Sequence, residues 1–118
     1  MRFGEPQTTE AAFARIQQWH KQKAELAACF AAAGGGMRVV LQGRIVRLSK
    51  ARLVLEGDTV QLAFNLAGCR FDYGPLDFVV WPGNRMGTAN GLHIVTDRAH
   101  WLFLAERGDS PLSLLQEP

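Results

Sequence analysis

Between residues 37 and 73, apolar and polar side chains alternate along the chain, and short polar pairs interrupt the alternation at close intervals. Successive side chains of an extended strand point to opposite faces, so a period of two indicates strands with one buried face. Interruptions this short leave room only for tight turns, which connect antiparallel neighbours. The tract therefore predicts an antiparallel sheet with one face in the protein core.

The alternation changes frame twice. The apolar set moves from Ile45 to Val46, and it moves again between Leu66 and Ala67, beside Gly68. A change of frame by one residue exchanges the two faces of a strand. We therefore expect a β-bulge at the first position, and either a second bulge or a corner at Gly68. Strands interrupted in this way curl, which predicts a strongly bent sheet or half-open barrel of about six or seven strands.

The first part of the chain has a helical pattern. Thr8 and Thr9 can cap the amino end of a helix, and Glu10 lies in the first turn, where the helix dipole favours a carboxylate. Alanine is frequent, apolar side chains recur on one stripe, and three glycines follow at residues 34–36. We expect an extended arm over residues 1–8, a helix over 9–33, a β-meander over 37–106 and a polar tail over 107–118. The helix should pack on the sheet, because amphipathic helices gain most of their stability from packing.

The length of the chain favours a single domain over residues 1–118, and the helix followed by strands predicts the α+β class. Hydrophobic residues make up 47% of the chain and charged residues 20%, and 118 residues are enough to bury a core. No segment has the length and hydropathy of a membrane span, and the amino end lacks a secretory pattern, so we expect a cytoplasmic protein without membrane association. Arginine outnumbers lysine by ten to three, a bias typical of GC-rich bacterial genomes.

The sequence lacks the short motifs that accompany nucleophilic or metal-dependent catalysis. Cys29 and Cys69 form no CxxC pair, and His20, His93 and His100 are not spaced as metal ligands. Neither GxSxG nor HExxH occurs. We therefore expect no metal, no cofactor and no enzymatic activity.

Basic residues are concentrated in residues 38–52, and no acid occurs between residues 25 and 56. In the expected register, Arg47 and Arg52 lie directly opposite each other, and Arg44 lies across from Glu56. Like charges in that position repel, so a bound anion would stabilise them. The alternative is a solvated face whose charges protect a sheet edge. No aromatic residue is interleaved with these cations, which argues against nucleic acid as a partner.

A second candidate anion contact lies between residues 82 and 91, where we expect a long irregular loop. Its glycines could present backbone N–H groups, with Arg85 as the accompanying cation. Together with the hairpin, this loop gives a candidate site for a small anion or nucleotide. Its residues are Arg44, Arg47, Arg52 and Arg85.

The last expected strand, over residues 101–104, is apolar on both faces. Such a strand is either central in its sheet or covered by another surface, and the tail adds three leucines. We therefore expect a homodimer or another homo-oligomer. The function expected from the sequence is a non-catalytic binding or self-assembly module. Small-anion or nucleotide binding through the arginine-rich hairpin is the alternative.

Overall fold

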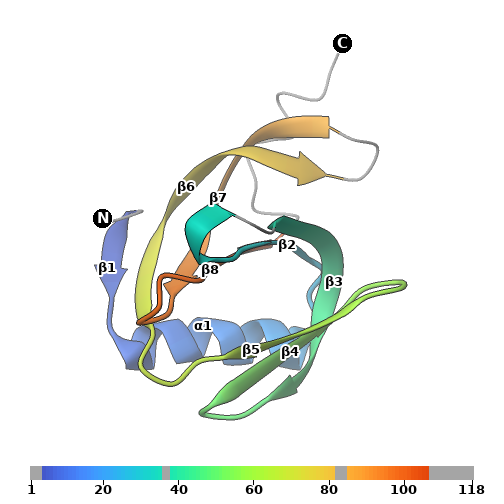
Figure 1. The fold of residues 1–118 in the computed structure, drawn as a ribbon. Helices are drawn as coiled ribbons and strands as arrows, with labels where there is room; N and C mark the ends of the chain where they lie inside the picture. Colours follow the sequence, from blue (N-terminus) through green and yellow to red (C-terminus); the bar gives the residue numbers. More distant parts are fainter. Residues whose placement is uncertain (1–3, 36–37, 82–84, 107–118) are drawn as a thin grey trace.

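The computed structural model describes residues 4–35, 38–81 and 85–106. One helix lies beneath a strongly curled antiparallel sheet (Figure 1). The sheet has eight strands in the order β1-β6-β7-β8-β2-β3-β4-β5 and is not closed into a barrel. This confirms the predicted α+β class, with more strands than expected. The elements are β1 (Glu5–Gln7), α1 (Thr9–Gln22), β2 (Leu26–Ala31), the 3-10 turn η1 (Ala33–Gly35), β3 (Arg38–Leu48), β4 (Arg52–Glu56), β5 (Gln61–Asn65), β6 (Arg70–Trp81), β7 (Arg85–Val95) and β8 (Trp101–Glu106).

The helix α1 begins where the sequence predicts and ends at Gln22, well before residue 33. The Thr8 hydroxyl caps the amino end by accepting a hydrogen bond of 3.0 Å from the Ala11 N–H. At the other end Lys23 adopts a left-handed conformation with φ of 53°, and its N–H donates to the His20 carbonyl at 3.2 Å. Lys23 therefore closes the helix as its C-cap.

The prediction of helix through residue 33 is wrong, because Leu26–Ala31 forms strand β2. This strand is hydrogen-bonded to β3 on one side and to β8 on the other. Its six residues are a continuous apolar run, a pattern that a buried strand and a helix share. Pairing along both edges and burial of residues 26–29 outweigh the helix preference of alanine.

The strands form two meanders and not the single meander expected over residues 37–106. Strands β2 to β5 follow one another in the sheet, as do β6 to β8, and the pairing of β8 with β2 joins the two sets. Gly68, with φ of 71°, makes a corner between β5 and β6, so the predicted change of frame there is a corner and not a bulge. The arm predicted over residues 1–8 contributes β1, which pairs with β6. As a result, β1 and β5 are the two edges of the sheet.

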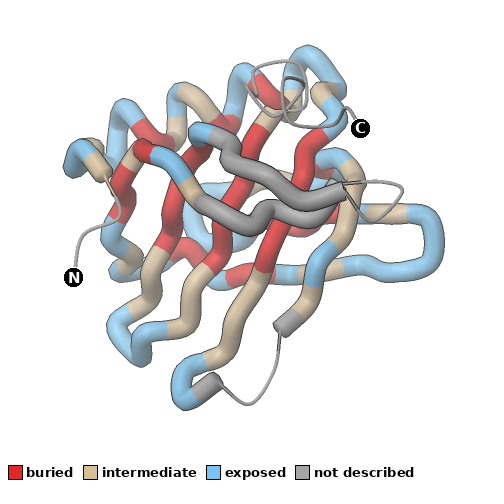
Figure 2. The backbone as a smooth tube through the Cα atoms, turned by 90° about the horizontal axis from the view of Figure 1, so that it is seen from above, coloured by how far each residue is buried: buried red, intermediate tan, exposed pale blue. Residues whose placement is uncertain are grey.

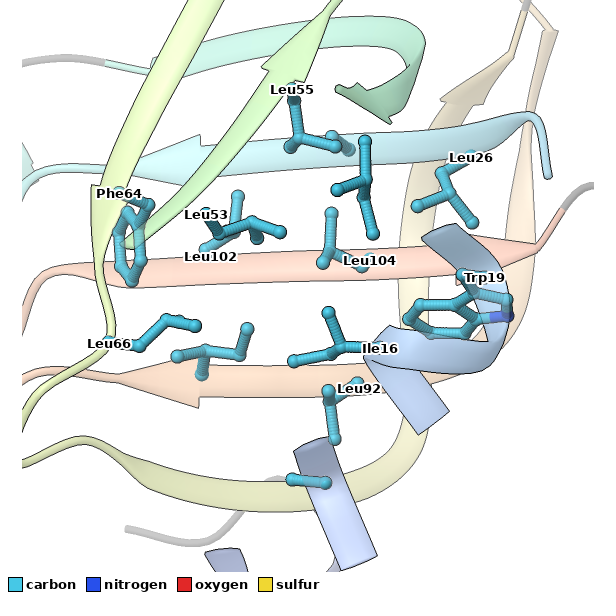
Figure 3. Packing of buried hydrophobic residues seen from close by; sticks show 14 of the residues in the cluster. Ile16, Trp19, Leu26, Leu53, Leu55, Phe64, Leu66, Leu92, Leu102 and Leu104 are labelled. Carbon is cyan, nitrogen blue, oxygen red and sulfur yellow. The ribbon is translucent and has the colours of Figure 1, made fainter. Parts of the chain in front are cut away.

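The predicted bulge in the first hairpin is confirmed. The register of β3 against β4 shifts between Ile45 and Arg47, and Arg44 lies opposite Glu56 as expected. A bulge bends its strand and increases the local twist. Phe64 of β5 consequently points into the same core as the inner faces of β2 and β8 (Figure 3).

The main core lies between α1 and the concave face of the sheet (Figure 3). Trp19 also donates from Nε1 to Glu106 Oε1 at 3.3 Å, which ties the end of the helix to the end of β8. Among the described residues, no helix has the length and apolar character needed to cross a membrane. The fully buried apolar side chains of this core are Ala12, Ile16, Leu26, Leu53, Leu55, Leu92, Ile94, Leu102 and Leu104.

A second, smaller core lies on the convex face of β2 and β8. It consists of Ala27, Cys29, Phe103 and Ala105, with Leu76 and Trp101 packed against them. Strand β6 contacts β2 although β7 and β8 lie between them in the sheet, so the β6–β7 hairpin folds over this face. Residues 102–105 of β8 are therefore buried on both faces. Figure 2 shows buried segments in the middle of the sheet and exposed residues at its turns. The strand is central and covered within one chain, which removes it as an argument for a dimer.

Candidate functional site

Strand β5 is an edge of the sheet, and β4 is its one paired neighbour among the described residues. The hydrogen bonds at its two ends fix the orientation of its backbone. The Gly57 N–H donates to the Val60 carbonyl at 2.8 Å, and the Leu66 N–H donates to the Ala51 carbonyl at 2.8 Å. Hydrogen-bonded pairs alternate along an antiparallel ladder, so the even-numbered residues of β5 point their backbone groups toward β4.

The odd-numbered residues of β5 therefore present their backbone N–H and C=O groups to the free edge. These residues are Gln61, Ala63 and Asn65, and all three are exposed. The Asn65 carbonyl accepts a weak bond of 3.3 Å from Cys69 Sγ, at the end of the strand. The centre of the edge, at Ala63, is a peptide group oriented to pair with another strand.

This edge lacks the features that usually prevent strands from associating. Natural edge strands carry charged residues or proline, or are very short. The sequence of β5, QLAFN, has neither a charge nor a proline over five residues. The opposite edge, β1, has three residues and includes Glu5 and Pro6. In the part of the chain that the structure describes, one edge of the sheet is therefore protected and the other is open to pairing.

The charges beside β5 are separated by sign. Lys50 and Arg52 lie at the end of β4 that adjoins Asn65, and Glu56 and Asp58 lie at the end that adjoins Gln61. All four charged side chains are exposed, and they are the only charges in residues 50–65. The β4–β5 hairpin is thus basic at one end and acidic at the other.

The expected opposition of Arg47 and Arg52 is wrong. The bulge shifts the register so that Arg47 lies opposite Val54, while Arg52 lies opposite Asn65 of β5. The two arginines are diagonal neighbours on the exposed face, two residues further apart than predicted. Strands β3 and β4 lie inside the sheet, so these cations do not protect an edge. Anion binding by this pair stays a prediction.

Arg44 lies in mixed and mostly acidic surroundings. It lines a groove of about 570 Å³ together with Glu25, Glu56 and Asp58. Val40 and Val60 also line this groove and are 41% and 44% exposed. Three carboxylates to one guanidinium make this groove less suited to an anion than the sequence suggested.

Arg85 is not brought near the other three arginines. Its backbone pairs with Trp81 in the β6–β7 ladder, and β8 and β2 separate β7 from β3. Figure 1 shows β4 and β5 at the bottom of the view with α1, while the far ends of β6 and β7 lie at the top. The loop expected over residues 82–91 is also wrong for residues 85–91, which belong to β7, and residues 82–84 lie outside the described part.

A buried polar cluster on the convex face was missed by the sequence reasoning. Asp72 and His93 lie opposite each other and are fully buried. Trp101 donates from Nε1 to His93 Nδ1 at 3.1 Å, and His93 Nε2 lies 3.3 Å from the Gly74 carbonyl. The ring is therefore neutral, with its proton on Nε2. Burial lowers the pKa of His93, against the opposing effects of backbone acceptors and Asp72.

The two cysteines are free thiols. Burial, with a contribution from Asp97, raises the pKa of Cys69 to about 11, which leaves little reactive thiolate near neutral pH. Within the described ranges no three His, Cys, Asp or Glu side chains gather as a metal ion would require. The open edge of β5 is thus the feature of the described surface with the clearest chemical capacity, which is backbone pairing.

Comparison of the chain with protein-family models, with curated proteins and with solved structures found no match.

Proposed function

We propose that this chain is a non-catalytic self-assembly module that associates by adding a strand at the free edge of β5. The observation that carries the proposal is the outward orientation of the Gln61, Ala63 and Asn65 backbone groups on an uncharged edge strand. Strand addition supplies affinity through backbone hydrogen bonds. The self-association expected from the sequence is retained here on different grounds, since the apolar face of β8 is covered within the chain.

The size of the edge indicates a weak, concentration-dependent contact. Each backbone hydrogen bond contributes about 1 kcal/mol net, because pairing replaces bonds to water. A strand of five residues with short exposed side chains adds little apolar area. Small interfaces of this kind are typical of transient or multivalent assemblies.

The replacement Ala63→Pro tests this proposal, because proline removes an N–H that points away from β4. Proline is tolerated on edge strands when its missing N–H faces solvent, so the β4–β5 ladder should remain intact. We expect the sedimentation-velocity mass of the wild-type protein to rise toward that of a dimer between micromolar and millimolar concentration. The Ala63→Pro protein should stay monomeric over the same range.

The matched control is Ala63→Val, which keeps the N–H and favours strand conformation. It should associate as the wild type does. Circular dichroism and thermal melting of all three proteins report whether the fold is retained. A wild-type protein that stays monomeric throughout would overturn the proposal, as would Ala63→Pro that is folded and associates like the wild type.

A further inference from the structure

We infer that the occupant of the free β5 edge is a second copy of this chain, antiparallel to the first about a two-fold axis at Ala63. This inference rests on the proposed function and adds the relative orientation of the two copies and the position of their axis. Its basis is the separation of charge along the β4–β5 hairpin, combined with the register of that hairpin.

The register places one charge in line with each end of β5. Arg52 pairs with Asn65 at one end, and Glu56 pairs with Gln61 at the other. The Gln61 side chain already extends toward Glu56, with Nε2 3.5 Å from Oε2. On the exposed face, each of the two end rows therefore contains one charge and one amide, and the central row consists of Val54 and Ala63.

With a two-fold axis at Ala63, each end row of one copy would continue into an end row of the second copy. Asn65 of one copy would lie opposite Gln61 of the second, so a row would read Arg52, Asn65, Gln61 of the second copy and Glu56 of the second copy. Strands in a sheet are about 4.8 Å apart, which puts the outer two backbones roughly 14 Å apart. Arginine and glutamate side chains can bridge most of that distance, with the two amides between them. The same row would be repeated by symmetry.

The backbone groups fit the same axis. Because Ala63 directs both its N–H and its C=O to the free edge, Ala63 of each copy would form a hydrogen-bonded pair with its counterpart. An axis perpendicular to the sheet also keeps the concave faces on the same side, so the half-buried Leu62 of each copy would continue one apolar face.

Parallel pairing in register meets two obstacles that the antiparallel arrangement avoids. It would bring the basic ends of both hairpins together at one end and the acidic ends together at the other, so no opposite charges would meet. A two-fold axis along the strands would also turn the apolar face of one copy to the polar side of the other. Antiparallel pairing therefore has the better charge complementarity.

The test compares the dissociation constants of the wild type, Lys50→Glu/Arg52→Glu and Glu56→Lys/Asp58→Lys by sedimentation equilibrium. Each double variant carries one sign at both ends of the hairpin, so its own dimer should be weaker by on the order of tenfold. An equimolar mixture of the two variants should recover the wild-type affinity, because opposite ends then meet. Raising the salt concentration should weaken the wild-type dimer and strengthen the dimers of both variants.

The outcomes separate this inference from the proposed function. A dimer that Ala63→Pro abolishes, but that neither the charge variants nor salt affect, overturns the antiparallel orientation and leaves the proposed function standing. A wild-type dimer strengthened by salt also overturns it, since that is the result expected when like ends meet. A wild-type protein that is monomeric alone overturns both, and the edge would then be assigned to a different partner.

Discussion

The replacement Gly91→Ala is expected to lower the free energy of unfolding by about 3 kcal/mol. Gly91 lies opposite Gly74, in the part of the β6–β7 hairpin that passes over β8. A Cβ atom at this position would meet the backbone carbonyl of Leu104 and lie 2.7 Å from a ring atom of Phe103. Neither can move away freely, because both residues are fully buried. The hairpin would have to lift from the second core.

Urea unfolding and thermal melting provide the measurement. For a chain of this size, about 3 kcal/mol corresponds to a loss of roughly 10 °C in Tm. The control is Gly68→Ala, since Gly68 has φ of 71° and no neighbouring atom lies within 4 Å of the position that the added Cβ would take. This variant should lose about 1 kcal/mol of the free energy of unfolding, because alanine is strained in the left-handed backbone conformation. Equal costs for the two variants would show that the close contact at Gly91 is not the cause.

Acidification is expected to destabilise the protein through His93. Burial lowers the pKa of the folded His93 below its ordinary value of 6.5, so the unfolded state binds more protons in the interval below that value. The free energy of unfolding should therefore keep its full value above about pH 6.5, and it should fall as the pH drops toward the pKa of the folded state. The slope for one such proton reaches about 1.4 kcal/mol per pH unit. Protonation of Nδ1 would also break the bond from Trp101.

The comparison is between the wild type and His93→Gln, unfolded in urea from about pH 7 to about pH 5. Glutamine can accept from Trp101 and donate to Gly74, but it does not titrate. The variant should lose less stability over this interval than the wild type does. Both proteins are measured at low concentration, so that association does not contribute to stability. Parallel curves for the two proteins would exclude His93 as the source of the pH dependence.

Much of the sheet could be predicted from the sequence, because one-sided burial leaves a period of two. The bulge after Ile45, the pairing of Arg44 with Glu56 and the cap at Thr8 were all read from local pattern and are confirmed. Strand β2 could not be read this way. Its run from Leu26 to Ala31 is apolar throughout, because both faces are covered, and a uniform run carries no period.

The candidate site was less accessible to sequence reasoning for a related reason. Whether a strand is central or at an edge depends on long-range pairing. Because β2 pairs with β8, the two sets of strands are joined there, and β5 is left at the edge of the sheet. The missed β2 therefore also hid the open edge. One signal was present in the sequence: QLAFN is a strand segment without charge or proline. The burial of Asp72 and His93 could not be predicted either. The alternation of apolar and polar residues predicts an exposed face there, but the β6–β7 hairpin folds over it.

The most direct measurement is hydrogen exchange of the β5 amides at low and high protein concentration. The N–H groups of Leu62 and Phe64 point to β4 and should be protected equally at both concentrations. The N–H groups of Gln61, Ala63 and Asn65 point to the free edge, and we expect them to exchange rapidly in dilute protein and slowly in concentrated protein. Rapid exchange of the Ala63 amide at every concentration at which the protein is associated would contradict self-assembly through this edge.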